Sequence, residues 1–302
     1  MGAASPVPAA ATTLLAVPNV SEGRDRAAVA AIGAAFGSGG VRLLDTHVDA
    51  DHNRSVFTLA GEPGVLAGAL LAGAREALAR IDLSRNDGVH PHVGAVDVVP
   101  VVHLDDARRG AACAEALVAA DLLGRAGLPV FLYGLLGGGR TRAELRHGGP
   151  AQLARRVAAG ELRPDFGPAA LDARHGAVLV AARPPLIAFN VELAAPATLE
   201  QARDIAAAIR ESGPEGLPGL RAIGLSLERA GIVQVSTNVE DHRAVPLAAV
   251  VAAVRRHAPV SGAELIGLPP EAALVGFPAD VPIRDFDPGR RILERVLAAA
   301  TV

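Results

Sequence analysis

The sequence contains no lysine, and all 29 of its strongly basic residues are arginine. A lysine Schiff base and a Walker-type phosphate loop are therefore excluded, because both need an ammonium group. The chain also has a single cysteine, Cys113. One cysteine can form neither an internal disulfide nor a thiolate zinc centre, which needs several.

A strong charge of either sign is also missing, since the formal net charge is only −3. No basic bias therefore points to nucleic acid as a partner. No apolar run approaches the roughly 20 residues that cross a bilayer. Residues 1–12 lack the positive start of a signal peptide, and we expect them to form a disordered tail. These absences predict a cytoplasmic protein with neither a membrane nor a nucleic-acid partner.

Half of the residues are apolar and a fifth are charged, which is typical of a globular protein. Short apolar runs alternate with alanine-rich helical stretches in the first part of the chain, and a smaller sheet-and-helix unit follows. No internal repeat of fixed period is visible. We expect strands at residues 14–17, 41–45, 56–60, 96–102, 129–134, 177–182, 186–193, 222–227, 232–237 and 263–268. The predicted fold class is α/β (α+β).

Three polar segments, 18–25, 45–55 and 84–97, each lie at the end of a predicted strand. Open α/β sheets place their ligand clefts at such strand ends. The three segments hold most of the residues suited to proton transfer or ligand binding: His47, His52, His90, His92, Asp45, Asp49, Asp51, Asp87, Asp97, Arg24, Arg54 and Arg85.

His90 is the best candidate for proton transfer. It lies between Gly88 and Pro91, and a residue before proline is pushed towards extended backbone. A histidine on a rigid loop before a strand suits acid–base chemistry at neutral pH. Two alternatives remain open from the residues alone. His90 can merely bond its neighbours, or it can bind a metal with His92, His47 and a carboxylate.

Arg54 and Arg85 are the arginines best placed beside such a cleft. The planar guanidinium pairs with a carboxylate through two hydrogen bonds, so these residues point to a ligand that carries carboxylates. The alternative for each arginine is an ordinary surface ion pair.

Segments along nearly the whole chain resemble the glutamate formimidoyltransferase (glutamate formiminotransferase) family, in the stand-alone form without the cyclodeaminase domain. The segments that carry the resemblance are VPNVSEGRD (17–25), LLDTHVDADHNRSVFTLAG (43–61), IDLSRNDGVHPHVGAVDVVP (81–100), VFLYG (130–134), PDFGP (164–168), LIAFNVEL (186–193), QVSTN (234–238) and GAELIGL (262–268). They occur in order and at consistent spacing.

The resemblance implies transfer of the formimino group from N-formimino-L-glutamate to N5 of tetrahydrofolate, a step of histidine degradation. His90 matches the family's catalytic histidine, the general base. Tetrahydrofolate is then a co-substrate, and no metal is needed. The implied architecture is two subdomains, residues 13–185 and 186–302, each a mixed β-sheet covered by helices, with a cleft or tunnel between them. A homodimer is also implied.

The resemblance also assigns binding roles. The substrate-binding residues would be Arg54, Arg85, Asp45, His47 and Asn19. The folate-contacting stretch corresponds to Gly167, Pro168, Ala169, Ala170, Leu171, Asp172, Ala173, Arg174, His175 and Gly176, which by composition is either a linker or a loop beside a cleft. His92 stands where the vertebrate pattern has arginine. Two other functions stay open: a metal-dependent hydrolase using His47, His90 and His92, and a non-catalytic folate-binding paralogue.

Overall fold

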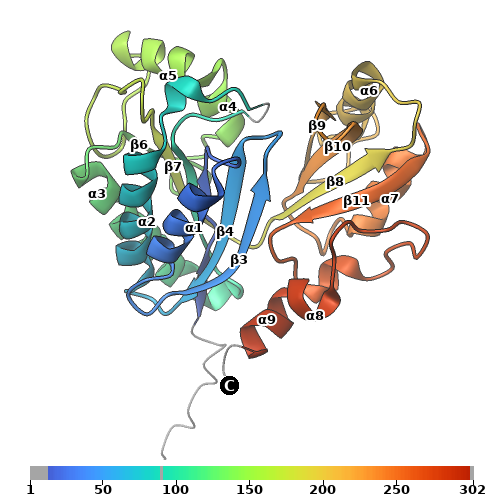
Figure 1. Ribbon diagram of the computed structural model, residues 1–302, viewed down its shortest axis with the longest axis horizontal. Helices are drawn as coiled ribbons and strands as arrows, with labels where there is room; N and C mark the ends of the chain where they lie inside the picture. Colours follow the sequence, from blue (N-terminus) through green and yellow to red (C-terminus); the bar gives the residue numbers. More distant parts are fainter. Residues whose placement is uncertain (1–12, 89–90, 300–302) are drawn as a thin grey trace, which may run out of the picture. The chain divides into compact units, whose positions relative to one another are not determined.

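The computed structural model describes residues 13–88 and 91–299, and the chain forms two compact units that are joined at Pro184–Pro185 (Figure 1). The tail expected at residues 1–12 lies outside the described residues. Within the described ranges, no helix has the length and apolar character needed to span a membrane.

The first unit is built on a mixed sheet with the strand order β3-β4-(β1, β2)-β5-β7-β6. Its strands are β1 (Leu14–Ala16), β2 (Asn19–Val20), β3 (Arg42–Asp49), β4 (Arg54–Gly61), β5 (Val96–Val102), β6 (Val130–Leu132) and β7 (Val178–Arg183). β1 and β2 are two parts of one interrupted strand, because each pairs antiparallel with both β4 and β5. Pro18 lies at the interruption, where it has no N–H to donate to a neighbouring strand. β7 pairs parallel with β5 and β6.

Helices cover both faces of this sheet. They are α1 (Arg26–Phe36), α2 (Leu66–Arg80), α3 (Arg109–Arg125), α4 (Arg142–Arg146) and α5 (Gly149–Ala158), with short 3-10 turns at Leu83–Arg85 and Asp106–Arg108. The first three pack on one face, where the Phe36 and Phe57 rings lie 5.2 Å apart. On the other face, α4 and α5 pack over β5, β7 and β6 through Phe131, Leu145 and Leu153. Among the residues that the structure describes, this second cluster includes none from β3 or β4.

The second unit has a four-stranded sheet in the order β11-β8-β10-β9. Its elements are β8 (Ile187–Leu193), α6 (Leu199–Ile209), β9 (Leu220–Leu227), β10 (Ile232–Val239), α7 (Leu247–Arg255) and β11 (Val260–Ile266), followed by a 3-10 turn at Glu271–Leu274, α8 (Pro288–Arg291) and α9 (Leu293–Ala299). Helices α6 and α7 pack on one face, against Phe189, Val191 and Val235.

The two units share one topology. Both run β-α-β-β-α-β, as β1-α1-β3-β4-α2-β5 and as β8-α6-β9-β10-α7-β11. Across the sheet, these four strands are ordered β5-β1-β4-β3 in the first unit and β11-β8-β10-β9 in the second, which is the same order by position in the chain. This is the split βαβ arrangement. The repeat is one of connectivity, so no fixed period of residues marks it in the sequence.

The predicted fold class is confirmed: both units are sheets covered by helices. The second sheet differs from expectation, because its described pairings are all antiparallel. Only the first unit adds β6 and β7 through helical crossovers, and these supply its parallel pairs. A polar loop was expected at residues 47–55, after the strand at 41–45. That loop is shorter than expected, since β3 continues to Asp49, β4 begins at Arg54 and only residues 50–53 turn. A cleft or tunnel stays a prediction.

Candidate functional site

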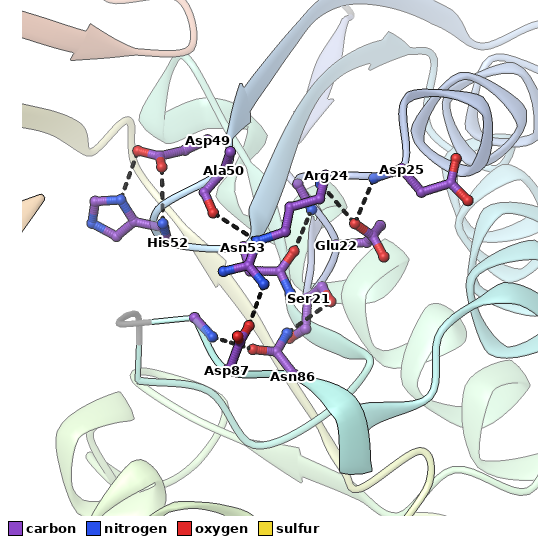
Figure 2. A network of polar contacts seen from close by, with 12 residues as sticks. Ser21, Glu22, Arg24, Asp25, Asp49, Ala50, His52, Asn53, Asn86 and Asp87 are labelled. Carbon is purple, nitrogen blue, oxygen red and sulfur yellow. Dashed lines mark hydrogen bonds and ion pairs between the residues drawn. The ribbon is translucent and has the colours of Figure 1, made fainter. Parts of the chain in front are cut away.

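The three polar segments of the first unit are joined by hydrogen bonds (Figure 2). The Gly23 N–H donates to Asn53 Oδ1 (2.9 Å), and Asn86 Nδ2 donates to the Ser21 carbonyl (2.9 Å). Arg24 contacts both other segments, because its Nε donates to the Ala50 carbonyl (3.0 Å) and its guanidinium pairs with Asp87. Residues far apart in the sequence are therefore held in one network.

Two glycines allow the backbones of these segments to touch. A Cβ on Gly88 would lie 2.2 Å from the His52 carbonyl oxygen, and one on Gly23 would lie 2.1 Å from the Asp49 carbonyl oxygen. No real side chain fits at such distances. The segment that leads to His90 is therefore packed directly against the turn between β3 and β4. His90 itself lies outside the described residues.

The chain beyond His90 is anchored as well. Asp97, which is 1% exposed, accepts a hydrogen bond from the Val93 N–H (2.9 Å) and pairs with Arg146 of α4. Ser21 Oγ donates to the Gly94 carbonyl (2.8 Å). Both flanks of the His90 position are thus fixed to the first unit. Arg146 lies outside the sequence motifs described above, so its role as the partner of Asp97 is seen only in the structure.

Asp49, which is partly buried, and His52, which is buried, form a pair in the same network. His52 is 3% exposed, and its Nδ1 lies 2.6 Å from Asp49 Oδ2. The His52 backbone N–H also donates to Asp49 Oδ1 (2.9 Å). Burial by itself raises the pKa of Asp49. The hydrogen bonds and charge of His52, with the charge of Arg54, outweigh burial and hold that pKa well below its ordinary value.

Sequence reasoning missed this pair as a unit, although it named both residues within a polar segment. The available signal was the spacing Asp49-x-x-His52. An aspartate that accepts from backbone N–H groups two or three residues later is a common turn device, and here it also reaches the histidine ring.

Four predicted substrate-binding residues lie on one face of the first sheet. Asp45 and His47 are two residues apart on β3, so they point to the same side. Strand pairing places His47 of β3 opposite Val56 of β4, and Val56 opposite Asn19 of β2. Arg54 lies two residues before Val56 on β4, so its side chain points to the same side. This face of the sheet points away from α1 and α2. Phe57, the neighbour of Val56 on β4, points the other way, into the core beneath those helices. Asn19 Nδ2 donates to the Val17 carbonyl (3.0 Å).

Arg85, the fifth of these residues, is placed differently. It belongs to the 3-10 turn Leu83–Arg85, its side chain is 87% exposed, and it pairs with Asp82 at 3.9 Å. The structure therefore does not place Arg85 on the sheet face that carries the other four.

The predicted folate stretch, residues 167–176, belongs to the first unit and lies directly before β7, so the linker reading is wrong. It runs beside both flanks of the His90 position: the Leu83 N–H donates to the Arg174 carbonyl and the Ala95 N–H to the His175 carbonyl (2.9 Å each). His175 Nε2 lies 3.1 Å from the Leu78 carbonyl, and Nδ1 lies 2.6 Å from Asp172 Oδ2. Most of residues 168–174 are exposed and so accessible to a ligand.

Among the described residues, no group of three histidine, cysteine or acidic side chains is placed to hold a metal ion. The proposed metal set of His47, His90 and His92 includes one residue, His90, that lies outside these ranges. The described part of the chain gives no support to the hydrolase hypothesis.

Comparison with known proteins identifies the family. The formiminotransferase domain, N-terminal subdomain, matches residues 13–183, and the formiminotransferase domain matches residues 188–279. The glutamate formimidoyltransferases of Thermoplasma acidophilum and Streptococcus pyogenes are each 34% identical to this chain. The first match covers 94% of this chain and 97% of the relative, and the second covers 93% and 97%.

The formimidoyltransferase-cyclodeaminase of Gallus gallus is 37% identical over 278 residues, which are 86% of this chain and 50% of that protein. The chain thus spans about half the length of this relative. Among solved structures, pitrilysin aligns at 13% identity over 82% of this chain and 33% of its own, with a TM-score of 0.21, too low to bear on the fold. Two matched subdomains and two relatives matched over nearly their full lengths show that the chain belongs to the formiminotransferase family.

Proposed function

We propose that this protein is a glutamate formimidoyltransferase. It would transfer the formimino group of N-formimino-L-glutamate to N5 of tetrahydrofolate, giving 5-formiminotetrahydrofolate and L-glutamate, as in histidine degradation. Family membership supports this function, as do the two relatives of that name that the chain matches over 97% of their length. The cyclodeaminase named in the longer relatives is not part of the proposal.

The chemistry requires one base. N5 of tetrahydrofolate attacks the formimino carbon, and His90 accepts the N5 proton as the new C–N bond forms. The tetrahedral intermediate then breaks its bond to the glutamate nitrogen, and the imidazolium returns the proton to that leaving amine. General-base help of this kind contributes about 10²–10⁴-fold to the rate.

The observation that carries the proposal is the arrangement around the His90 position. Its flanks are locked into the network of segments 18–25 and 45–55, and residues 167–176 run alongside both flanks. In this proposal, residues 167–176 contact the folate. Arg54 would meet a substrate carboxylate, and Asp45, His47 and Asn19 would line the same sheet face. Arg85 would reach a carboxylate from its exposed turn.

Further parts of the proposal follow the family. Tetrahydrofolate acts as co-substrate without a metal, and the protein works in the cytoplasm as a homodimer. Sedimentation equilibrium of the purified protein measures its mass, and a monomer at micromolar concentration would contradict the dimer.

The test is to mix purified protein with formiminoglutamate and tetrahydrofolate and to measure glutamate release. We expect release that depends on tetrahydrofolate and is unchanged by a metal chelator. No release, with no binding of tetrahydrofolate, would refute the proposal. Binding without release would favour the folate-binding paralogue instead. Release of formiminoglutamate's one-carbon group to water, lost on chelation, would favour the hydrolase.

A further inference from the structure

His175 lies in the stretch that the proposed function assigns to folate, and both of its ring nitrogens contact oxygen atoms. Nδ1 lies 2.6 Å from Asp172 Oδ2, and Nε2 lies 3.1 Å from the Leu78 carbonyl oxygen. An ionised carboxylate and a backbone carbonyl only accept hydrogen bonds, so each contact needs a proton on the nitrogen. A neutral imidazole has one such proton, whereas the imidazolium has two. The two contacts together therefore match the protonated ring.

The Leu78 carbonyl is a favourable partner for a cation. It belongs to the last turn of α2, where the final carbonyls have no partner within the helix. The negative end of the helix dipole lies at this end, and a protonated histidine is stabilised there. The side chain of His175 is 29% exposed, and charges that are partly buried are screened less by salt than exposed ones.

The His175 ring joins α2 to a tight turn formed by residues 172–176. Within the turn, the Gly176 N–H donates to the Asp172 carbonyl (2.7 Å), and the Arg174 N–H donates to Asp172 Oδ1 (3.1 Å). The turn is packed directly on the segment after the His90 position, because a Cβ on Gly176 would lie 2.2 Å from the Val93 carbonyl oxygen. The turn is short and bonded within itself, so a contact that holds the ring holds the whole turn.

Charged groups on the adjoining elements have partners of their own. These pairs are Arg80 with Glu76 on α2, Asp82 with Arg85 at the 3-10 turn, and Asp97 with Arg146 beyond Val93. Arg174 is exposed, and its charge acts on Asp82. Asp172 is thus the acidic group in contact with the ring. His92, a second histidine, precedes Val93 in the chain, so variants are needed to separate the two.

We propose that His175, as the imidazolium, is a positioning residue that fastens residues 172–176 to the C-terminal end of α2 and thereby sets the affinity for tetrahydrofolate. The inference rests on the proposed function, which assigns residues 167–176 to folate. The ring acts through the turn and not by touching a substrate. When the ring loses a proton as the pH rises, one of its two hydrogen bonds is lost and the turn is held less firmly. Affinity for tetrahydrofolate should therefore be higher at pH 6 than at pH 8.

Two variants and a matched control test this role. His175→Gln removes the charge and the ring, whereas Asp172→Asn keeps the ring and removes the charge of its partner. The control is His257→Gln in the second unit. His257 is also 29% exposed, and its Nε2 lies 3.1 Å from a carboxylate oxygen of Glu215.

The first measurement is calorimetric binding of tetrahydrofolate at pH 6 and pH 8 in oxygen-free buffer. We expect the wild type and His257→Gln to bind about 10-fold more tightly at pH 6, which corresponds to the loss of one charge-assisted hydrogen bond. His175→Gln should bind weakly at both pH values, with no difference between them. Asp172→Asn should bind more weakly than the wild type at pH 7.

The second measurement is amide hydrogen exchange of residues 172–176 in the free protein, corrected for the intrinsic effect of pH. We expect protection in the wild type that falls from pH 6 to pH 8, and little protection in His175→Gln at either pH. Protection and affinity that are both unchanged in His175→Gln would overturn the inference. Lost protection with unchanged affinity would also overturn it, because the ring would then have a structural role alone.

The two measurements also separate this inference from the proposed function. A wild type that binds no tetrahydrofolate but shows the expected exchange would refute the proposed function and support the fastening by His175. A wild type that transfers the formimino group, with His175→Gln equal to it in both measurements, would refute only this inference. Should His175→Gln not fold, Asp172→Asn decides, and wild-type protection and affinity in that variant at pH 7 would overturn the inference.

Discussion

Gly88→Ala tests whether backbone packing positions the segment that carries His90. The added Cβ would lie 2.2 Å from the His52 carbonyl oxygen and 2.7 Å from the Asn53 Cβ. Ordinary contact begins near 3.4 Å, so the two segments must separate by about 1 Å. The atom that obstructs the new methyl group belongs to the backbone of a turn that also holds Asp49 and His52.

The expected result is a large loss of activity with a smaller loss of stability. A misplacement of about 1 Å can cost ~10²-fold in rate, so kcat/KM for formimino transfer should fall by about that factor. Overpacking costs about 1–3 kcal/mol of unfolding free energy. Steady-state kinetics and urea denaturation measure the two effects.

Gly68→Ala is the matched control, because a Cβ on this α2 glycine meets no heavy atom within 4 Å. Alanine should stabilise that helix by about 0.5–1 kcal/mol and leave kcat/KM unchanged. A folded Gly88→Ala protein with wild-type kcat/KM would show that this close approach does not position the catalytic segment.

Two further predictions concern stability. Asp49 has a pKa in the folded protein below its unfolded value of about 3.9, so its stabilising effect is present above that pH and is lost as the pH falls below it. Asp49→Asn should therefore lower the free energy of unfolding by about 1–3 kcal/mol at pH 7. Urea denaturation at a series of pH values should show this loss shrinking below pH 4. A loss that stays constant with pH would contradict the pairing with His52. Arg146→Ala leaves Asp97 buried without its ion pair and should cost about 3–5 kcal/mol, whereas Arg125→Ala, which removes an exposed pair, should cost less than about 1 kcal/mol. Equal losses in urea denaturation would contradict the buried role.

Local pattern was enough to predict much of the fold. Apolar runs such as Val96–Val102 became strands, and Asp25 caps α1 with its side chain, as aspartate before a helix commonly does. Polarity misled the prediction for residues 47–49, which belong to β3 and not to the loop that follows it. A polar strand and a polar loop look alike until the pairing partner, β4, is known.

The candidate site was predictable in part. The polar segments 18–25, 45–55 and 84–97 were identified from composition and position, but the contacts that join them depend on tertiary structure. The ion pair of Asp97 with Arg146 links residues 49 positions apart, and nothing in either local sequence indicates it.

The most direct test of the central claim compares wild type and His90→Ala in the same assay of folate-dependent glutamate release from formiminoglutamate. The account predicts release by the wild type and a fall in kcat of about 10²–10⁴-fold in the variant, with tetrahydrofolate binding retained. Equal kcat values for the two proteins would contradict the role of His90, and no release by the wild type would contradict formimino transfer itself.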